Sequence, residues 1–580
     1  MTTERFQSQR ISSVCIAMTG SGGAGVMTSG NMLLRAAALA GCYGFMSRSS
    51  GPQIRGGEAA ALIRLANGPI EGLDDRFDIL LSVDWGNLDR FAMEIPLNGE
   101  SLIVGDPAQG EMPPAMAGFG AKRLDLPMKD MAKAIPGGRA NMIALGYVAG
   151  LVGLPDGMVD EAVRGTLEPG SEAVAASLAA VAAGREIAAA VDFPRKLKVS
   201  GPARAGRWLI TGNEATGYGA LSGGVRFVAA YPITPATEIL EWMAPALADV
   251  GGALVQAEDE LASITMAIGA SYGGTPALTA TSGPGLSLMT ESLGLAIAAE
   301  VPLVVVDVMR GGPSTGIPTK SEQADLNIAL FGTHGDAPHV VVAPNSVADC
   351  LATTEWAVHL AEEMQVPVVV LSDQLMGQAR MVIDPPARGA YVGERRVATP
   401  NGEAYRRYAL TESGVSPMAV PGIPGLMYTA DGLEHNEQGT PSSQAKDHVA
   451  QLDKRQRKLS GGDFGSHCAE IEGEGEIAVV TWGSCTAPAR EAVARAREAG
   501  IEAKLISLRL LAPAQPAMLA GALAGVKRIL VVEQTHSGQF HRYLRAEHAL
   551  EGEVRALHKP GPLPMRPGDI YQQLVEWSRS

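Results

Sequence analysis

The chain has 580 residues and a formal net charge of −15. Hydrophobic residues make up 46% of it, which is enough for folded interiors, and a chain of this length exceeds one hydrophobic core, so we expect three domains. The negative charge argues against nucleic-acid binding. No signal-peptide pattern and no apolar stretch of membrane-spanning length is present, so we expect a cytoplasmic protein without a membrane segment.

The cysteines stand singly, as Cys15, Cys42, Cys350, Cys468 and Cys485. Zinc and iron–sulfur sites take closely spaced cysteines, and no two of these are close in sequence. We therefore expect five buried free thiols and no cluster in this chain.

The first α/β unit opens with an apolar strand at residues 12–18, a glycine-rich turn and a helix that runs to Leu39. The turn, from Gly20 to Gly25, matches Gly-x-Gly-x-x-Gly, in which backbone N–H groups and a helix N-terminus approach a phosphate. A nicotinamide cofactor would need an acid about 20 residues later, and Arg48 stands there instead. The turn is therefore either structural or a phosphate contact for another ligand.

More strands and helices complete this unit, at residues 79–83, 101–104, 129–150 and 156–182. The stretch 192–207 is rich in Pro, Lys, Arg and Gly, which is typical of an interdomain linker. A helix then begins, with Gly212 or Asn213 as its predicted N-cap.

The second unit alternates strands and helices, and polar residues collect where its strands end. These elements are predicted at residues 225–230, 236–247, 254–256, 262–271, 276–280, 286–299 and 301–308. The last strand is apolar almost throughout, as expected of a strand buried on both faces of a parallel sheet. Ligands of such sheets bind beyond the carboxyl ends of the strands, where we expect the site.

Periodicity is lost after Asp384 and returns near Gly465, and so long an irregular segment is usually functional or forms an interface. Regular alternation resumes from Glu476, with elements predicted at residues 477–481, 487–499, 503–508, 515–524 and 528–532.

Four stretches of the second unit occur in a fixed order. They are the turn 231–235 (Tyr-Pro-Ile-Thr-Pro), the acids 258–260 (Glu-Asp-Glu), the loop 279–285 (Thr-Ala-Thr-Ser-Gly-Pro-Gly) and the loop 310–316 (Arg-Gly-Gly-Pro-Ser-Thr-Gly). Together they resemble the pyrimidine-binding domain of thiamine-diphosphate-dependent 2-oxoacid:ferredoxin oxidoreductases. With the flanking units, most of the chain resembles the fused gamma–alpha subunits of the 2-oxoglutarate type.

The resemblance implies a multi-domain α/β fold with a transketolase-like pyrimidine-binding domain. The implied parts are a gamma-type domain over 1–192, a linker over 193–207, the alpha domain over 208–390, an irregular connecting segment over 391–470 and a transketolase-C-like domain over 471–580.

One catalytic carboxylate is implied. In this family a Glu that faces the thiamine pyrimidine precedes an Ala/Gly-rich helix by a fixed interval, and matching that interval to Gly269 selects Glu260. Glu258 and Asp259 are then helix-start charges, and the alternative is that all three acids only cap the helix. The resemblance adds cofactor contacts by Tyr231, Pro232 and Ile233.

Substrate contacts are implied for Thr234, Arg310, Thr315 and Thr319. A guanidinium such as that of Arg310 suits a carboxylate. The loop 313–320 is polar where a branched-chain pocket would be apolar. The second carboxylate of 2-oxoglutarate would need hydrogen-bond donors in the pocket, which polar side chains of this loop can supply. The loop therefore favours 2-oxoglutarate as the substrate.

Missing motifs imply a partner. Asp431-Gly432 lacks the leading glycine of the diphosphate–magnesium motif Gly-Asp-Gly. The resemblance therefore implies a beta subunit with the diphosphate site, Mg²⁺ and a [4Fe-4S] cluster, in an (alpha–beta)₂ heterotetramer that reduces ferredoxin. It also implies that Gly22, Gly23, Arg48 and Arg55 assist coenzyme A, although both arginines equally suit a solvated or interface loop.

We thus expect oxidation of 2-oxoglutarate with coenzyme A to succinyl-CoA and CO₂, reversible as a carboxylase in reductive carbon fixation. Pyruvate or a branched-chain 2-oxoacid is the alternative substrate. Two alternatives differ in kind: a lipoamide-linked dehydrogenase or transketolase subunit, and a non-catalytic nucleotide-binding or assembly subunit in which Glu260 and Arg310 are dispensable.

Overall fold

The computed structural model describes residues 12–51, 57–86, 88–199, 206–317, 319–386 and 391–579. The chain forms two compact units. One comprises residues 1–210 and 379–386, and the other comprises residues 211–378 and 387–580. The segment 379–386 therefore returns from the middle of the sequence to the N-terminal unit.

The N-terminal unit is built on an eight-stranded sheet with the order β6-β5-β4-β1-β3-β2-β14-β7. Its strands are β1 (Ser13–Gly20), β2 (Tyr43–Ser50), β3 (Ala59–Ala66), β4 (Ile79–Ser82), β5 (Leu102–Gly105), β6 (Lys122–Asp125), β7 (Trp208–Thr211) and β14 (Arg380–Ile383). β3 runs antiparallel to both β1 and β2. The sequence did not predict β2 and β3, because the polar residues where β2 ends and before β3 begins are typical of a loop.

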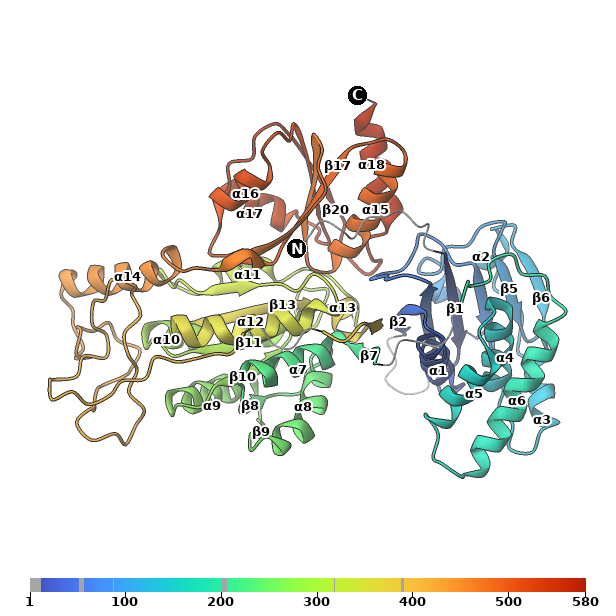
Figure 1. The fold of residues 1–580 in the computed structure, drawn as a ribbon, viewed down its shortest axis with the longest axis horizontal. Helices are drawn as coiled ribbons and strands as arrows, with labels where there is room; N and C mark the ends of the chain where they lie inside the picture. The colour runs from blue at the N-terminus through green and yellow to red at the C-terminus, as the bar shows by residue number, and fades with distance from the viewer. Residues whose placement is uncertain are drawn as a thin grey trace. The chain divides into compact units, whose positions relative to one another are not determined.

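Helices cover one face of this sheet (Figure 1). The larger ones are α1 (Val26–Leu39), α4 (Ala140–Val152), α5 (Asp156–Arg164) and α6 (Glu172–Ala188). Alternate residues of β1 divide between two cores: Ile16 and Met18 pack under the helices, and Ala17 packs in the cluster on the other face. The short helices α2 (Pro114–Ala117) and α3 (Met128–Lys133) complete the unit.

The second unit contains a seven-stranded sheet with the order β18-β12-β13-β11-β10-β8-β9. Its strands are β8 (Phe227–Ala230), β9 (Ala253–Gln256), β10 (Ala277–Thr281), β11 (Leu303–Met309), β12 (Val340–Val342), β13 (Pro367–Asp373) and β18 (Leu510–Ala512). Only β18, which comes from the C-terminal part of the chain, pairs antiparallel. The other strands are parallel, so their carboxyl ends lie at one edge.

Helices sandwich this sheet. One core packs α9 (Glu260–Tyr272) and α10 (Gly283–Ala298) on the sheet, and the other packs α7 (Gly212–Gly223), α8 (Thr237–Asp249) and α12 (Asp349–Met364) on it. α9 buries Ile264, Ala267, Ile268 and Ser271, the spacing of one helical face. The predicted N-cap of α7 was wrong. Thr211 is the cap, since its hydroxyl accepts from the Glu214 N–H while the Glu214 carboxylate accepts from the Thr211 N–H.

The C-terminal part adds a five-stranded sheet with the order β15-β17-β16-β19-β20. Its strands are β15 (Ala469–Glu472), β16 (Ile477–Trp482), β17 (Ala503–Leu508), β19 (Arg528–Glu533) and β20 (Glu553–His558). Its helices are α15 (Thr486–Glu498), α16 (Pro516–Ala522), α17 (Gln539–Glu547) and α18 (Pro567–Ser578). Side chains of both sheets share one hydrophobic core, so this part packs directly on the seven-stranded sheet.

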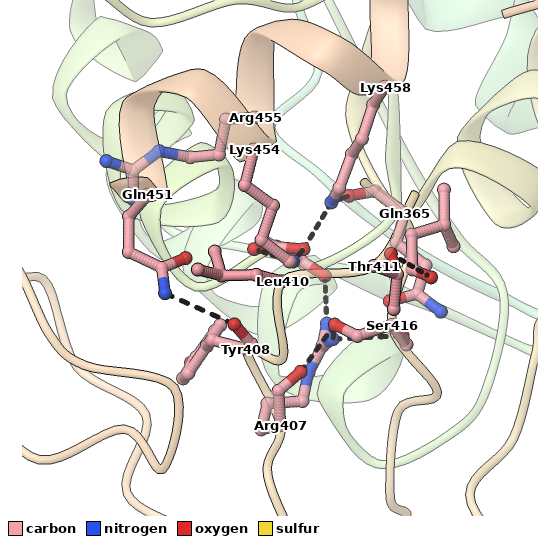
Figure 2. A network of polar contacts seen from close by, with 12 residues as sticks. Gln365, Arg407, Tyr408, Leu410, Thr411, Ser416, Gln451, Lys454, Arg455 and Lys458 are labelled. Atoms are coloured by element: carbon pink, nitrogen blue, oxygen red, sulfur yellow. Dashed lines mark hydrogen bonds and ion pairs between the residues drawn. The ribbon is translucent and has the colours of Figure 1, made fainter. Parts of the chain in front are cut away.

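The segment that joins these two sheets contains helix α14 (Ala445–Ser460), which the weak periodicity did not predict. A buried ion cluster anchors this helix. Lys454 contacts both carboxylate oxygens of Glu300, at 2.5 and 2.6 Å, and Lys458 pairs with the same carboxylate. Arg407 donates to the Glu300 carbonyl at 2.7 Å, and Figure 2 shows Lys454 and Lys458 reaching down from α14 toward the segment that carries Arg407.

The five cysteines are buried and unpaired, as predicted. Within the described ranges, no helix combines the length and apolar character needed to cross a membrane.

Candidate active site

The carboxyl edge of the seven-stranded sheet brings most of the predicted site residues together. Thr234 follows β8, Glu260 follows β9 and Arg310 follows β11. These strands are parallel: β8 and β9 are neighbours, and β10 lies between β8 and β11. A direct contact links two of them, because Arg310 Nη1 donates to the Thr234 carbonyl at 2.6 Å. In the same turn, the Tyr231 side chain is exposed and Pro232 and Ile233 are half-buried.

Glu260 is the first residue of α9, and only 7% of its surface is exposed. Asp259 is the N-cap, accepting from the Ala262 N–H at 2.7 Å, which confirms its predicted helix-start role. The Glu260 side chain lies against Gly285, where an added Cβ would come within 2.7 Å of Oε1. Among the described residues the structure gives its carboxylate no hydrogen-bond partner, so this group can accept from a ligand. Such an acceptor suits a ligand that brings its own N–H, as a protonated pyrimidine nitrogen does.

Arg310 is half-buried, and burial lowers the pKa of its guanidinium while Asp325 and Asp307 raise it. Its buried Nε has no hydrogen-bond partner among the residues the structure describes. The guanidinium is therefore held at one nitrogen and keeps donors for an incoming carboxylate. The sequence did not single out Asp307 or Asp325, because Asp307 stands inside an apolar strand.

The loop after Arg310 closes on itself. Gly311 N–H donates to the Lys320 carbonyl at 2.9 Å, and Ile317 N–H donates to the Gly311 carbonyl at 3.0 Å. Gly316 has φ +68°, and a Cβ there would overlap the Gly311 carbonyl, so the loop needs glycine. Thr315 is exposed and Thr319 is half-buried, and both are carried by this closed loop.

The C-terminal part of the chain holds the base of this loop. One contact stays within the seven-stranded sheet, where Ser321 Oγ donates to Asp373 at the end of β13 at 2.9 Å. Gln323 N–H donates to the Gln534 carbonyl at 2.9 Å, and Gln323 Nε2 donates to the Trp482 carbonyl at 2.9 Å. The loop that carries the predicted threonines therefore depends on strands β16 and β19. No local sequence signal marks Gln323 or Gln534.

In the N-terminal unit, the Gly20–Gly25 turn and Arg48 lie at one sheet edge, because Gly20 and Ser50 both pair with Ala59. Gly22, Gly23 and Arg48 are exposed. The Ser21 N–H and hydroxyl donate to Asp84 at 2.8 and 2.7 Å, so part of the turn is already occupied by a carboxylate. Arg55 lies outside the described residues.

Family models match three segments of the chain. Residues 15–187 match the pyruvate ferredoxin/flavodoxin oxidoreductase model, and residues 218–454 match the model described as pyruvate flavodoxin/ferredoxin oxidoreductase, thiamine diphosphate-binding. Residues 434–542 match the transketolase C-terminal domain.

Relatives agree with these matches. The 2-oxoglutarate synthase subunit KorA of Methanothermobacter marburgensis is 36% identical over 374 residues, which cover 63% of this chain and 98% of that protein. The 2-oxoglutarate oxidoreductase subunit KorA of Mycobacterium tuberculosis is 31% identical, covering 94% of this chain and 88% of that protein. The chain belongs to the 2-oxoacid:ferredoxin oxidoreductase family.

A solved structure of this family also matches. It is the 2-oxoglutarate:ferredoxin oxidoreductase from Magnetococcus marinus with 2-oxoglutarate, coenzyme A and succinyl-CoA bound. The TM-score is 0.90 at 35% identity, over 97% of this chain and 99% of that chain. The predicted multi-domain α/β fold with a thiamine-diphosphate-binding domain is confirmed, and the chain is an oxidoreductase alpha subunit. This assignment replaces two alternatives from the sequence: a lipoamide-linked dehydrogenase or transketolase subunit, and a non-catalytic nucleotide-binding or assembly subunit.

Proposed function

We propose that this alpha subunit oxidises 2-oxoglutarate with coenzyme A to succinyl-CoA and CO₂, passing two electrons singly to ferredoxin, and that a low-potential donor drives the reverse carboxylation. The observation that carries the proposal is the common sheet edge of Glu260, Thr234 and Arg310, where Arg310 is held by the Thr234 carbonyl and its buried Nε has no partner among the described residues. A general base and an anion-binding group are what a 2-oxoacid reaction requires.

Thiamine diphosphate supplies a nucleophilic carbon at C2 of its thiazolium when bound. Glu260 accepts the hydrogen bond of the pyrimidine and holds the proton whose position controls that carbon. Tyr231, Pro232 and Ile233 form the turn that faces the cofactor. Glu260 is largely buried at the start of α9, and low solvent exposure strengthens such a hydrogen bond.

Arg310 binds the carboxylate next to the reacting carbonyl, and the Thr234 hydroxyl donates to the same group. Thr315 and Thr319 contact the distal carboxylate of 2-oxoglutarate, since the closed loop presents hydroxyl groups where an aliphatic substrate would need apolar ones. Pyruvate and branched-chain 2-oxoacids lack the group that these donors would satisfy.

Coenzyme A is assigned to the N-terminal unit. The exposed Gly22, Gly23 and Arg48 lie at one sheet edge, and Arg55 belongs to the same proposal from the sequence. Phosphate groups bind well to glycine-rich turns and arginines. The solved relative from Magnetococcus marinus has coenzyme A bound, which supports coenzyme A as the co-substrate.

A beta subunit completes the enzyme. We place in it the diphosphate and Mg²⁺ site and the [4Fe-4S] cluster, in an (alpha–beta)₂ assembly in the cytoplasm. The five cysteines of this chain are distributed singly and buried, which supports a cluster held by the partner.

The test is co-expression with the beta subunit, followed by viologen reduction across a panel of 2-oxoacids. We expect the highest kcat/KM for 2-oxoglutarate. Glu260→Gln should lower kcat by roughly 100-fold or more, the scale of an essential proton-transfer group. Glu258→Gln is the matched control, because Glu258 is exposed two residues away, and it should stay within about twofold. A preference for pyruvate or 2-oxoisovalerate, or normal turnover of Glu260→Gln, would contradict the proposal.

A further inference from the structure

Two carboxyl groups that the proposed reaction does not use lie within electrostatic range of Arg310. Asp307 is in β11 and is 0% exposed, and Asp325 follows the loop that carries the predicted threonines. The two carboxyl groups lie close enough to interact directly. Both oxygens of Asp307 and Oδ2 of Asp325 are shielded from solvent and have no N–H or hydroxyl donor among the described residues.

A proton is required to make this contact favourable. Two carboxylates in contact repel each other, and a buried site cannot hold both charges, so one group stays protonated and donates to the other. Burial and the neighbouring Asp325 raise the pKa of Asp307 well above its ordinary value. Burial, helped by Glu322, raises the pKa of Asp325 to about 6 against the opposing effects of Asp307 and Arg310. At neutral pH, Asp307 is the donor and Asp325 carries the charge.

The surroundings of Asp325 favour that charge. A Cβ on Gly283 would lie 2.7 Å from both Asp325 oxygens, so the carboxylate lies against the N-terminus of the 16-residue helix α10. α10 has no acidic residue in its first turn, and helix N-termini stabilise negative charge. The charged groups that face Asp325 are Asp307 from β11, Arg310 beyond β11 and Glu322 on its own loop.

We propose that Asp307 and Asp325 share one proton, and that the single negative charge of this pair positions Arg310 for the substrate carboxylate. The role of Arg310 rests on the proposed function. With one proton, the pair and Arg310 sum to zero charge. Without it, the sum of −1 would repel an anionic substrate. With two protons, Arg310 would keep only its bond to the Thr234 carbonyl as a polar anchor. Both aspartates are thus positioning residues.

Two isosteric variants of the assembled enzyme separate their roles. Asp325→Asn removes the negative charge that acts on the Arg310 guanidinium, so KM for 2-oxoglutarate should rise about tenfold, with a smaller fall in kcat. The acid limb of kcat/KM near pH 6 should disappear. Asp307→Asn still donates to Asp325, so it should keep that limb and change KM by less than about threefold. Equal losses in the two variants, or an unmoved acid limb in Asp325→Asn, would overturn the proposal.

The shared proton is also measurable without turnover. At neutral pH, the infrared difference spectrum between the wild-type chain and Asp307→Asn should contain the band of a buried protonated carboxyl group. Absence of this band would overturn the shared proton. The infrared measurement tests the shared proton even if the Asp325→Asn variant fails to assemble. If the wild-type complex oxidises no 2-oxoacid, the proposed function fails. If it oxidises 2-oxoglutarate and Asp325→Asn leaves KM and the acid limb unchanged, only the positioning role fails.

Discussion

The buried ion cluster on α14 predicts an unequal response to the loss of its charges. Glu300 is 1% exposed, and its single carboxylate faces the ammonium groups of Lys454 and Lys458, with Arg407 nearby. Removing the one anion from a buried cluster costs about 3–5 kcal/mol, because the cations stay buried without a counter-charge. Lys458→Met instead removes a surplus cation and leaves the Glu300–Lys454 pair, so it should cost about 1 kcal/mol or less.

The destabilisation caused by Glu300→Gln should depend on pH in a definite direction. Burial lowers the pKa of Lys454 to about 8 and that of Lys458 to about 7, while Glu300 opposes the shift. The unfolded chain therefore binds more protons than the folded chain between about pH 7 and the ordinary lysine pKa of about 10.5, and these lysines destabilise the fold less as pH rises through that window. Glu300→Gln should accordingly cost nearer 5 kcal/mol at pH 6 and nearer 3 kcal/mol at pH 8.

The assay is amide hydrogen exchange of α14, because unfolding of a multi-domain chain is not two-state. Glu300→Gln should speed exchange by roughly 100- to 5,000-fold, the factor that corresponds to about 3–5 kcal/mol. Glu476→Gln is the control, since its ion pair with Lys527 is about two-thirds exposed and should contribute under about 1 kcal/mol. An effect of Glu300→Gln no larger than this control, or one that grows with pH, would refute the reasoning.

Four further predictions concern the enzyme itself. The isolated chain should be colourless and inactive, and iron analysis that finds a stoichiometric cluster in it would contradict the beta-subunit proposal. Thr319→Val should raise KM for 2-oxoglutarate more than for 2-oxobutyrate, because only the former loses a donor, so equal changes would speak against the distal contact. Gly316→Ala should raise KM for 2-oxoglutarate at least about tenfold with little change in α14 exchange, since it forces open the closed loop at φ +68°; an unchanged KM would show that the loop is not a substrate contact. Arg55→Ala should weaken coenzyme A use and spare 2-oxoacid decarboxylation, and unchanged coenzyme A dependence would indicate a structural loop.

Local patterns in the sequence were sufficient for much of the fold. Period-two and period-3.6 spacing located most strands and helices of the second unit and the C-terminal part within a few residues, because each element buries its own apolar face. The position of Glu260 at the start of α9 also follows from local information, since an acidic N-cap and a buried helix face determine where that helix begins.

Contacts between distant segments were decided only by the tertiary structure. Glu300 meets Lys454 across 154 residues, and Gln323 meets Gln534 across 211. β14 returns to the sheet of the N-terminal unit, and Asp307 meets Asp325 beside a helix N-terminus. The energy of these contacts comes from burial, hydrogen bonding or charge pairing that exist only once the chain has folded back on itself. An apolar strand therefore conceals Asp307, and an irregular stretch conceals the helix that carries two buried lysines.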